Sequence, residues 1–503
     1  MNQAADRIPV IIGVGQVNDR TEDHAVAPDS LGLMEAALRC ADADAGGGWL
    51  TQLNSLAVVD QISFPDLGDV SRLLATQLGA APRLCEKTRL ANGDSPILLL
   101  NQAANRIGSG EIDVAAVVGG EALRTAARRA AAAAAVPGTH DAVRTSAARA
   151  APAYRHRYGL ITPIEVYPLY ENAGRAAYGQ SLAEGQEETG EIWARFSQVA
   201  ATNPGAWIRK PVSAEVVRTP SKDNRPLAFP YNKLMVANSS VNQGAGFIVT
   251  SLAKALAHGL SEQQFVYVGH GAAAHEPDDF LERDAYFHSV SMAVSLQRTL
   301  EMNALGVDDL DFVELYSCFP CVPKMARRVI GWPVEKPATV FGGLTFGGGP
   351  IGNYMSHAVV SMVQALRNGG VNGLLFANGG FATHNHSIIL SRRPPPPGTF
   401  PQNFDFQAEA DSRRGPIPPL VEGYIGPGVI ETFTVLYERD GSPRFGVIVA
   451  RNPAGGRFLA KVSKDDEAGL AALVDDSIQP IGTSGIAVAD PNGDAVWKRP
   501  ERS

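Results

Sequence analysis

Two cysteines have a spacing known for chemistry. Cys318 and Cys321 form a C-x-x-C pattern, which supports redox exchange beside a helix N-terminus and binds a metal when a second ligand pair is present. The other two cysteines, Cys40 and Cys85, do not form such a pair. We therefore expect Cys318 and Cys321 to be packing residues, and we expect no metal site. So few cysteines are typical of a reducing compartment.

Histidines offer acid–base chemistry at one place in the chain. His384 and His386 alternate in the segment "THNHS", and alternate residues of an extended strand share one face. Such a pair either lines a pocket or forms ordinary hydrogen bonds, and a metal would need a third ligand that we do not find. His270 directly follows an apolar run, and we expect it to be structural.

A glycine-rich stretch suggests a binding loop without reactive groups. The segment "GGLTFGGGPIGN" (342–353) has six glycines in twelve residues, and it contains no cysteine, histidine, lysine or carboxylate. Glycine is used where the backbone turns sharply or approaches something closely. The loop therefore has the backbone for a ligand and lacks side chains to act on one.

Composition limits the class of protein. The chain has 503 residues, 45% of them hydrophobic, and a formal net charge of −8. That length predicts two to four domains, and the negative charge argues against nucleic acid as the main partner. No run of about 18 apolar residues occurs, and the N-terminus does not resemble a signal peptide. We expect a cytoplasmic protein without a membrane span.

The first 390 residues alternate short apolar runs with longer helical patterns, which is typical of α/β structure. Three strand endings recur in the same order, about 256–260 residues apart along the chain, and periodic recurrence indicates duplicated halves. The pairs are Gly13 with Gly269, Asp60 with Tyr316, and Gly120 with Gly380. The alternative is that the recurrence is a coincidence, because apolar strands followed by glycine are common.

Composition also marks domain boundaries. We expect a first half over 1–124 that is completed by 226–252, an Arg- and Tyr-rich insertion over 125–225, and a second half over 253–391. A proline-rich linker covers 392–400, because four prolines favour an extended connector. Residues 401–503 are expected to form a small β-barrel-like domain, with a hairpin turn at Asp440-Gly441.

Five segments in this order resemble the thiolase superfamily, which includes acetyl-CoA acetyltransferases and thiolases of the sterol-carrier type. They are "NQAANRIGSGEIDVAAVVGGE", "LMVANSSVNQGAGFIVTS", "LDFVELYSCFP", "GGLTFGGGPIGN" and "FANGGFATHN". The resemblance covers about residues 7–391 and implies a duplicated α/β core of five layers, α-β-α-β-α, with a central loop-domain insertion. An extra C-terminal β domain, which we expect to be OB-like, resembles that of type 1 thiolase-like proteins.

The departures from the family lie at its reactive positions. By register, the nucleophilic cysteine of thiolases maps at or beside Gly93, their Gly-His-Pro histidine maps to Gly349, and their second cysteine maps near Phe376. None of these residues does nucleophilic or acid–base work. Asp94 and Ser95 stand beside Gly93 and before Pro96, where we expect them to cap a helix N-terminus rather than to react.

Backbone N–H groups and one tyrosine could still stabilise an oxyanion, although the reactive thiolase side chains are absent. The resemblance points to the backbone N–H groups of Gly93 and Gly380 as donors, since donors do not need to be nucleophiles. Tyr316 replaces a thiolase asparagine and could hydrogen-bond an enolate or act as an acid, with His384 as a second catalytic candidate. Further pocket candidates are Asn92, Asp94, Ser95, Cys318, Gly348, Asn353, Asn378 and His386.

The resemblance implies an acyl-CoA-handling protein that transfers an acyl group, or makes or breaks a carbon–carbon bond, without a covalent cysteine intermediate. The alternatives are a non-catalytic acyl-CoA- or lipid-binding or scaffolding protein, and a retro-aldolase on the thiolase fold. Coenzyme A thioesters are the expected substrates, and we expect no tightly bound cofactor. Arginines of the insertion either meet coenzyme A phosphates or are solvated. A homodimer is possible, since thiolases usually dimerise.

Overall fold

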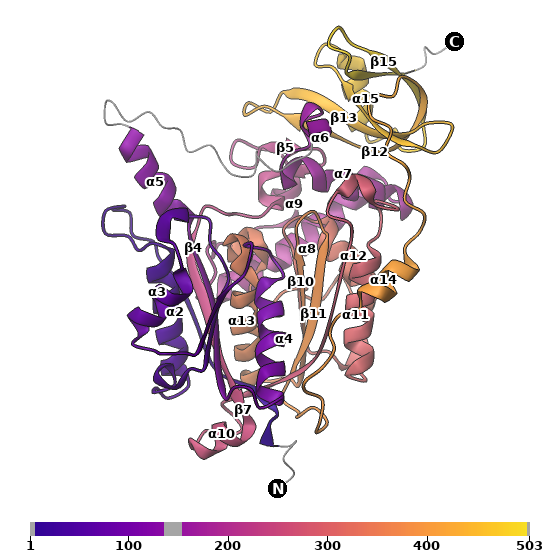
Figure 1. Cartoon of the computed structure of the whole chain (residues 1–503). Helices are drawn as coiled ribbons and strands as arrows, with labels where there is room; N and C mark the ends of the chain where they lie inside the picture. Colours follow the sequence, from indigo (N-terminus) through magenta and orange to yellow (C-terminus); the bar gives the residue numbers. More distant parts are fainter. Residues whose placement is uncertain (1–5, 135–152, 500–503) are drawn as a thin grey trace.

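The structure, a computed structural model, describes residues 6–134 and 153–499. Two layered α/β halves share one extended sheet system, and a small barrel lies beyond one end of both halves (Figure 1). Among the described residues, no helix combines the length and the apolar composition that crossing a lipid bilayer requires.

The first half is a five-stranded sheet in the order β3-β2-β4-β7-β1. Its strands are β1 (Pro9–Asn18), β2 (Ser55–Val58), β3 (Leu84–Lys87), β4 (Val114–Ala122) and β7 (Asn242–Ser251). Helix α2 (Ser30–Asp44) packs directly on β1, because Gly13 has no side chain there. A Cβ on Gly13 would lie 2.1 Å from the carbonyl oxygen of Ala41.

The second half repeats this arrangement in the order β8-β11-β10-β9. Its strands are β8 (Val266–His275), β9 (Phe312–Leu315), β10 (Asn372–Gly379) and β11 (His384–Ser391). Strand β2 is parallel to β4 in the first half, as β9 is to β10 in the second. The last strand inserts antiparallel in both halves, β7 between β1 and β4 and β11 between β8 and β10. The predicted duplication is confirmed.

Five layers follow from how the helices cover these sheets. Helices α4 (Ser95–Gly108) and α13 (Tyr354–Asn368) lie between the two halves and contact strands of both (Figure 1). The outer layers are α2 with α3 (Val70–Leu78) on the first half, and α11 (Val290–Met302) with α12 (Cys321–Ile330) on the second. The predicted α-β-α-β-α core is therefore confirmed.

Most of the insertion lies between the halves and the barrel, while its first helix, α5 (Leu123–Ala134), projects from the first half (Figure 1). Its other helices are α6 (Ala153–Arg157), α7 (Pro163–Ala177), α8 (Leu182–Thr202) and α9 (Ala214–Arg218). The predicted stop of the alanine-rich helix at Pro137-Gly138 lies outside the described residues. After α9, the hairpin β5 (Pro226–Ala228) and β6 (Tyr231–Asn232) pairs with the barrel. The expected boundary at 226 is therefore too early, and β7 alone completes the first sheet.

The barrel closes through five strands in the order β12-β13-β14-β16-β15-β12. They are β12 (Gly426–Tyr437), β13 (Pro443–Arg451), β14 (Arg457–Val462), β15 (Ser484–Ala489) and β16 (Ala495–Lys498). Helix α15 (Glu467–Val474) joins β14 to β15, and β14 runs parallel to β16. A closed five-stranded barrel of this kind is OB-like, as predicted. The hairpin at Asp440-Gly441 is confirmed, with Gly441 at φ 87°.

The segment after the proline linker belongs to the second half rather than to the barrel. Gln402 donates a backbone hydrogen bond to Asn105 Oδ1 at 2.7 Å, and its side chain accepts from Gly271 N at 3.0 Å. Helix α14 (Gln407–Arg413) then packs on β8 and α11. The bridge between Leu420 and Arg457 is the first pairing with the barrel. The expected start of the barrel domain at 401 is therefore too early.

Candidate active site

The segments that the sequence aligned with a reaction centre meet at the N-terminus of α4. A Cβ on Gly93 would lie 2.1 Å from Asn378 O and 2.5 Å from the Tyr316 hydroxyl oxygen. A Cβ on Gly352, in the glycine-rich loop, would lie 2.7 Å from the backbone of Ala91. Segments more than two hundred residues apart in sequence therefore surround one helix end.

Tyr316 occupies the space that a side chain at position 93 would need. The ring is 6% exposed and packs edge-on against Tyr354, with 5.6 Å between ring centroids. Its hydroxyl forms no hydrogen bond with the residues that the structure describes. Burial, with smaller effects of Cys318 and Asp94, raises the pKa of Tyr316 well above 10. The phenol is therefore neutral near pH 7 and can donate a hydrogen bond, whereas it cannot act as a base there.

The side chain of Asn92 accepts hydrogen bonds from both main-chain N–H groups that the sequence analysis had expected to bind an oxyanion. Its Oδ1 accepts from Gly93 N at 3.1 Å and from Gly380 N at 3.0 Å. Gly379 makes room for this amide, because a Cβ there would lie 2.1 Å from Asn92 Oδ1. The expectation that Gly93 and Gly380 donate directly to a ligand is therefore corrected. The Asn92 Nδ2 group has no hydrogen-bond partner among the described residues and carries two N–H donors.

The glycine-rich loop is buried, and its polar groups are used within the chain. Gln243 Nε2 donates to Gly347 O at 2.8 Å, and Gly349 N donates to Asn238 O at 2.8 Å. Gly348 (φ 104°) packs against the Gln243 side chain. Asn353 Nδ2 donates to Gly119 O at 2.6 Å. These contacts give the glycines a structural use.

Three further candidates from the sequence are also enclosed by the fold. Phe376 on β10 is fully buried, and its carbonyl accepts from Tyr316 N at 3.1 Å. Asn378 Nδ2 donates to Asn385 Oδ1 at 2.9 Å. Cys318 is buried, and burial raises its pKa to about 12, so the thiol is protonated and unreactive near neutral pH.

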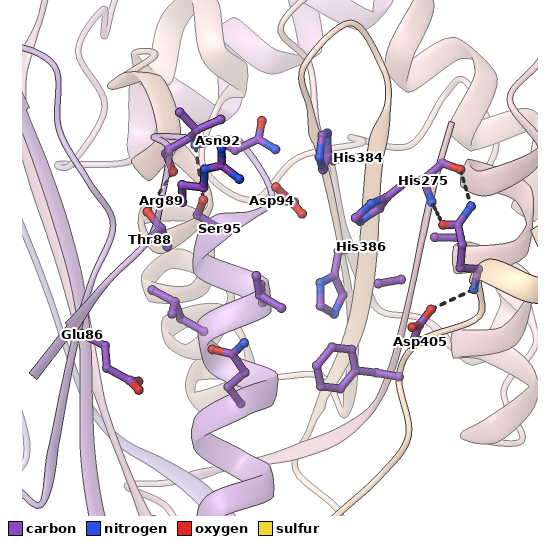
Figure 2. A pocket seen from close by; sticks show the side chains of 18 of the residues that line it. Glu86, Thr88, Arg89, Asn92, Asp94, Ser95, His275, His384, His386 and Asp405 are labelled. Atoms are coloured by element: carbon purple, nitrogen blue, oxygen red, sulfur yellow. Dashed lines mark hydrogen bonds between the residues drawn. The ribbon is translucent and has the colours of Figure 1, made fainter. Parts of the chain in front are cut away.

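A cleft of about 850 Å³ opens on the other side of the α4 N-terminus (Figure 2). Its walls are the β3–α4 connection, the N-terminal half of α4, the ends of β8 and β11 that meet there, and residues 404–407. Of the predicted site residues, it brings together Asn92, Asp94, Ser95, His384 and His386. Tyr316, Cys318, Gly348, Gly349, Asn353, Phe376 and Asn378 are not among its lining residues.

Asp94 is the buried ionisable group of this cleft. It is 6% exposed, and its carboxylate forms no hydrogen bond with any other described residue. Burial raises its pKa to about 6, and His275 partly opposes this shift. The predicted capping role is wrong for the side chains, because Asp94 occupies the N-cap position without a capping bond. Ser95 Oγ instead accepts from Asn92 N at 3.3 Å. A buried, unpartnered carboxyl with a pKa near 6 suits general acid–base chemistry.

Histidines form the wall that faces Asp94 (Figure 2). The rings of His275 and His384 lie 4.5 Å apart, and His384 Nδ1 contacts Thr383 Oγ1 at 3.0 Å. Burial lowers the pKa of both rings. The predicted shared face of His384 and His386 agrees with their places on β11 and in the cleft lining.

His386 is held as a neutral ring by a short chain of amides. Gln402 Nε2 donates to Asn101 Oδ1 at 2.8 Å, which leaves Asn101 Nδ2 as the donor to His386 Nε2 at 2.6 Å. The remaining proton is therefore on Nδ1. Burial lowers the pKa of His386 to about 3, so it does not titrate near neutral pH. Among the described residues, no group of three or more His, Cys, Asp or Glu side chains is placed to hold a metal ion.

Among the cleft residues that the sequence analysis missed are His275, Arg89 and Asp405. His275 is the last residue of β8, the strand that also contains His270. The sequence analysis recognised this strand, so the residue at its end could have been identified as a site candidate. His270 itself contacts Gln402, with 3.2 Å between Nδ1 and Oε1, and supports the fold as expected. Arg89 is exposed and forms no ion pair or hydrogen bond with the described residues.

Arginines of the insertion are engaged within the chain where the structure describes them. Arg124 and Arg128 both pair with Glu22. Arg155 is buried near Asp279, with 3.7 Å between Nε and Oδ2. The expected contact of the insertion with coenzyme A stays a prediction.

Part of the chain matches a family model. Residues 405–491 match the model described as the additional C-terminal domain of thiolase-like protein type 1. No match is found among curated proteins.

Solved structures match over the whole chain or most of it. A monomeric SCP2-thiolase like protein type 1 (STLP1) from Mycobacterium smegmatis is 30% identical, with 98% of this chain and 99% of that chain covered and a TM-score of 0.82. The Ltp2-ChsH2(DUF35) aldolase is 18% identical (77% and 98% covered, TM-score 0.59). An acetyl-CoA acetyltransferase from Syntrophomonas wolfei is 14% identical (77% and 99% covered, TM-score 0.57). The last two show likeness of fold alone.

Proposed function

The chain belongs to the SCP2-thiolase-like proteins of type 1, and we propose that it makes or breaks a carbon–carbon bond in a β-hydroxy or β-keto acyl-CoA by acid–base chemistry. No cysteine would form a covalent intermediate. The reaction would take place in the cleft beside α4 rather than at the buried glycine-rich loop. The fold of the Ltp2-ChsH2(DUF35) aldolase, similar over 77% of this chain, is compatible with cleavage of this kind.

One observation carries the proposal: Asp94 is a buried carboxyl without a hydrogen bond or ion pair to any other described residue, and it lines a cleft large enough for a ligand. Most buried carboxylates are paired, because an unpaired buried charge is costly. With a pKa of about 6, Asp94 is mostly ionised at pH 7, and its conjugate acid still gives up a proton readily. The group is thus suited to take and return one proton in a cycle.

The cleavage direction can be written with all atoms accounted for. The Asp94 carboxylate takes the proton of the β-hydroxyl, the bond between the α- and β-carbons breaks, and the β-carbon leaves as an aldehyde or ketone. The electron pair stays on the thioester as an enolate. Asp94 then returns its proton to the α-carbon, which yields the shortened acyl-CoA. Formation of the bond is the reverse sequence.

Asn92 supports the enolate in this scheme. Its Oδ1 accepts two main-chain N–H groups, those of Gly93 and Gly380, and this polarises the amide so that Nδ2 becomes a stronger donor. Asn92 lines the same cleft as Asp94, so the donor and the base belong to one cavity.

The test is turnover of defined thioesters by the full chain. We expect a β-hydroxyacyl-CoA to give a shorter acyl-CoA plus a carbonyl compound, both identified by mass spectrometry, and we expect Asp94→Asn to lose this activity. Acetoacetyl-CoA and an aryl-β-ketoacyl-CoA serve as the β-keto substrates, each with free coenzyme A present, because its thiol takes the acyl group when the bond between the α- and β-carbons breaks. Absence of products from all three classes would refute the proposed reaction.

A non-catalytic role is the second candidate, because the positions of the three reactive thiolase side chains are filled by Gly93, Gly349 and Phe376. In that case acyl-CoA would raise the melting temperature of the protein without turnover, and Asp94→Asn would leave this shift in place. The expected homodimer stays a prediction, and size-exclusion chromatography with light scattering tests it.

A further inference from the structure

A buried arginine of the barrel reaches into the second half of the core. Arg457, the first residue of β14, is 0% exposed and holds Glu431 through two hydrogen bonds, from Nε at 2.9 Å and Nη2 at 2.7 Å. Its remaining nitrogen, Nη1, donates to two backbone carbonyls outside the barrel, those of Leu281 and Arg283, the latter at 2.6 Å. Arg457 thus joins the barrel to the segment that carries Arg283.

Arg283 continues this connection to the β10–β11 turn, residues 379–383. Its Nη2 donates to the carbonyls of Phe381 and Ala382, and the side chain is 1% exposed. Arg283 Nε and Nη1 have no hydrogen-bond partner among the described residues. If the turn moved away, this buried guanidinium would lose its acceptors, which is costly for a charged group.

The same turn carries Gly380, whose N–H binds Asn92 at 3.0 Å. It is held from a second side by α7, because Tyr167 OH donates to Gly380 O at 3.0 Å and Tyr170 OH donates to Phe381 O at 2.8 Å. Helix α7 is itself fixed to the barrel, where Thr432 Oγ1 donates to Leu169 O at 2.6 Å. Both supports of the turn therefore lead back to the barrel.

We propose that the C-terminal barrel fixes the 379–383 turn, and with it the Asn92 amide, through Arg457 and Arg283 acting as positioning residues. The functional meaning of this contact rests on the proposed reaction, since the turn borders the Asp94 cleft. Neither arginine lines that cleft, so each would act through the turn and not on the ligand.

The test is amide hydrogen exchange of the full chain, read by mass spectrometry on peptides that cover 379–383. Loss of a hydrogen bond from a charged group predicts roughly tenfold faster exchange of this turn in Arg457→Gln, with the rest of the core unchanged. Arg451→Gln is the matched control. Arg451 binds the same Glu431 but is directed to Gly455 O inside the barrel, so the turn should exchange as in the wild type.

Equal exchange of the turn in both variants would overturn the inference. If circular dichroism shows that Arg457→Gln does not fold, Arg283→Lys decides instead, because it lies outside the barrel and keeps the charge. The lysine side chain ends one bond short of the position of Nη2, the atom that bonds both carbonyls, so we expect the same faster exchange confined to the turn. An unchanged turn in Arg283→Lys would also overturn the inference.

Turnover separates this inference from the proposed function. If the wild type cleaves a thioester, Arg457→Gln should lower kcat and kcat/KM by about the same factor, because the turn would support the transition state. If no thioester reacts but the exchange results hold, the proposed reaction fails while the role of the barrel stands.

Discussion

The two sides of the α4 N-terminus differ in how far the chain uses its own polar groups. On the Tyr316 side, the glycine-rich loop is bound by Gln243 and Asn238, and the space at Gly93 is filled by the phenol. On the Asp94 side, a carboxylate, an amide Nδ2 group and an exposed arginine line an open cleft and have no hydrogen bond to another residue in the part of the chain that the structure describes. The comparison teaches that a glycine-rich backbone shape can be held by packing within the chain, whereas polar groups that line an open cleft mark where chemistry can happen.

Removing the key group on each side should give the largest contrast. We expect Asp94→Asn to lower turnover by roughly 100-fold or more, the usual effect of losing a general acid–base group. Tyr316→Phe removes a hydroxyl that has no hydrogen-bond partner among the described residues, and should change turnover by less than about threefold. Steady-state kinetics of both variants measure this. The reverse order of effects would place the chemistry at Tyr316.

Asn92→Asp tests whether the Asn92 amide donates to the ligand. The new carboxylate still accepts from Gly93 and Gly380 but offers no N–H, so kcat should fall by roughly 100-fold, as for loss of an oxyanion donor. The added charge also acts on Asp94, so the kinetics are measured across pH. A drop that disappears at higher pH would mean that only the titration of Asp94 changed.

Gly93→Ala tests how closely the Tyr316 side is packed. The new Cβ would meet the Asn378 carbonyl at 2.1 Å, and we expect a loss of roughly 3 kcal/mol in the free energy of unfolding. Gly306→Ala is the control, because its nearest neighbour would be 3.6 Å away. Urea denaturation compares the two variants. Equal stability would show that this side has room for a side chain.

The stability of the protein should depend on pH through Asp94. Its folded pKa of about 6 lies above the ordinary aspartate value of 3.8, so the unfolded state loses the proton first. Asp94 therefore does not lower stability below pH 3.8, and as the pH rises to 6 it lowers the free energy of unfolding by roughly 2–3 kcal/mol. Relative to the wild type, Asp94→Asn should gain that amount above pH 6. Urea denaturation at pH 4 and pH 7.5 measures the difference, and a pH-independent difference would contradict the shift.

Alkylation of cysteines should have the smallest effect. Iodoacetamide should modify the exposed Cys40, while Cys318 and Cys321 are buried with raised pKa values. Turnover should then remain unchanged, with modification confirmed by mass spectrometry of the intact protein. Loss of activity on alkylation would restore a cysteine mechanism.

Much of the fold could be predicted because it is encoded by local patterns. The strand endings at Gly13 and Gly269 gave the duplication, and Asp440-Gly441 gave a barrel hairpin. Boundaries at 226 and 401 were wrong, because which sheet accepts a short strand or connector depends on tertiary contacts. The cleft residues Asn92, Asp94 and His384 were identified because they stand close in sequence to Gly93 and Gly380, two positions given by the family resemblance. The hydrogen bonds from Gly93 and Gly380 to Asn92 could not be predicted in this way. Asn92 and Gly380 are 288 residues apart, and no local sequence pattern specifies how the Asn92 side chain is oriented toward such a distant segment.

The pairing of β5 with β12 has a consequence for how the polypeptide is made. Phe229 and Thr434, which join these segments through a hydrogen bond, are 205 residues apart. At roughly 5–20 residues per second, translation would leave the β5–β6 hairpin waiting about 10–40 s for its partner strand. A nascent chain that stops at the proline linker would expose this hairpin and the face of α7, so the last-made domain completes an early one instead of being a detachable module.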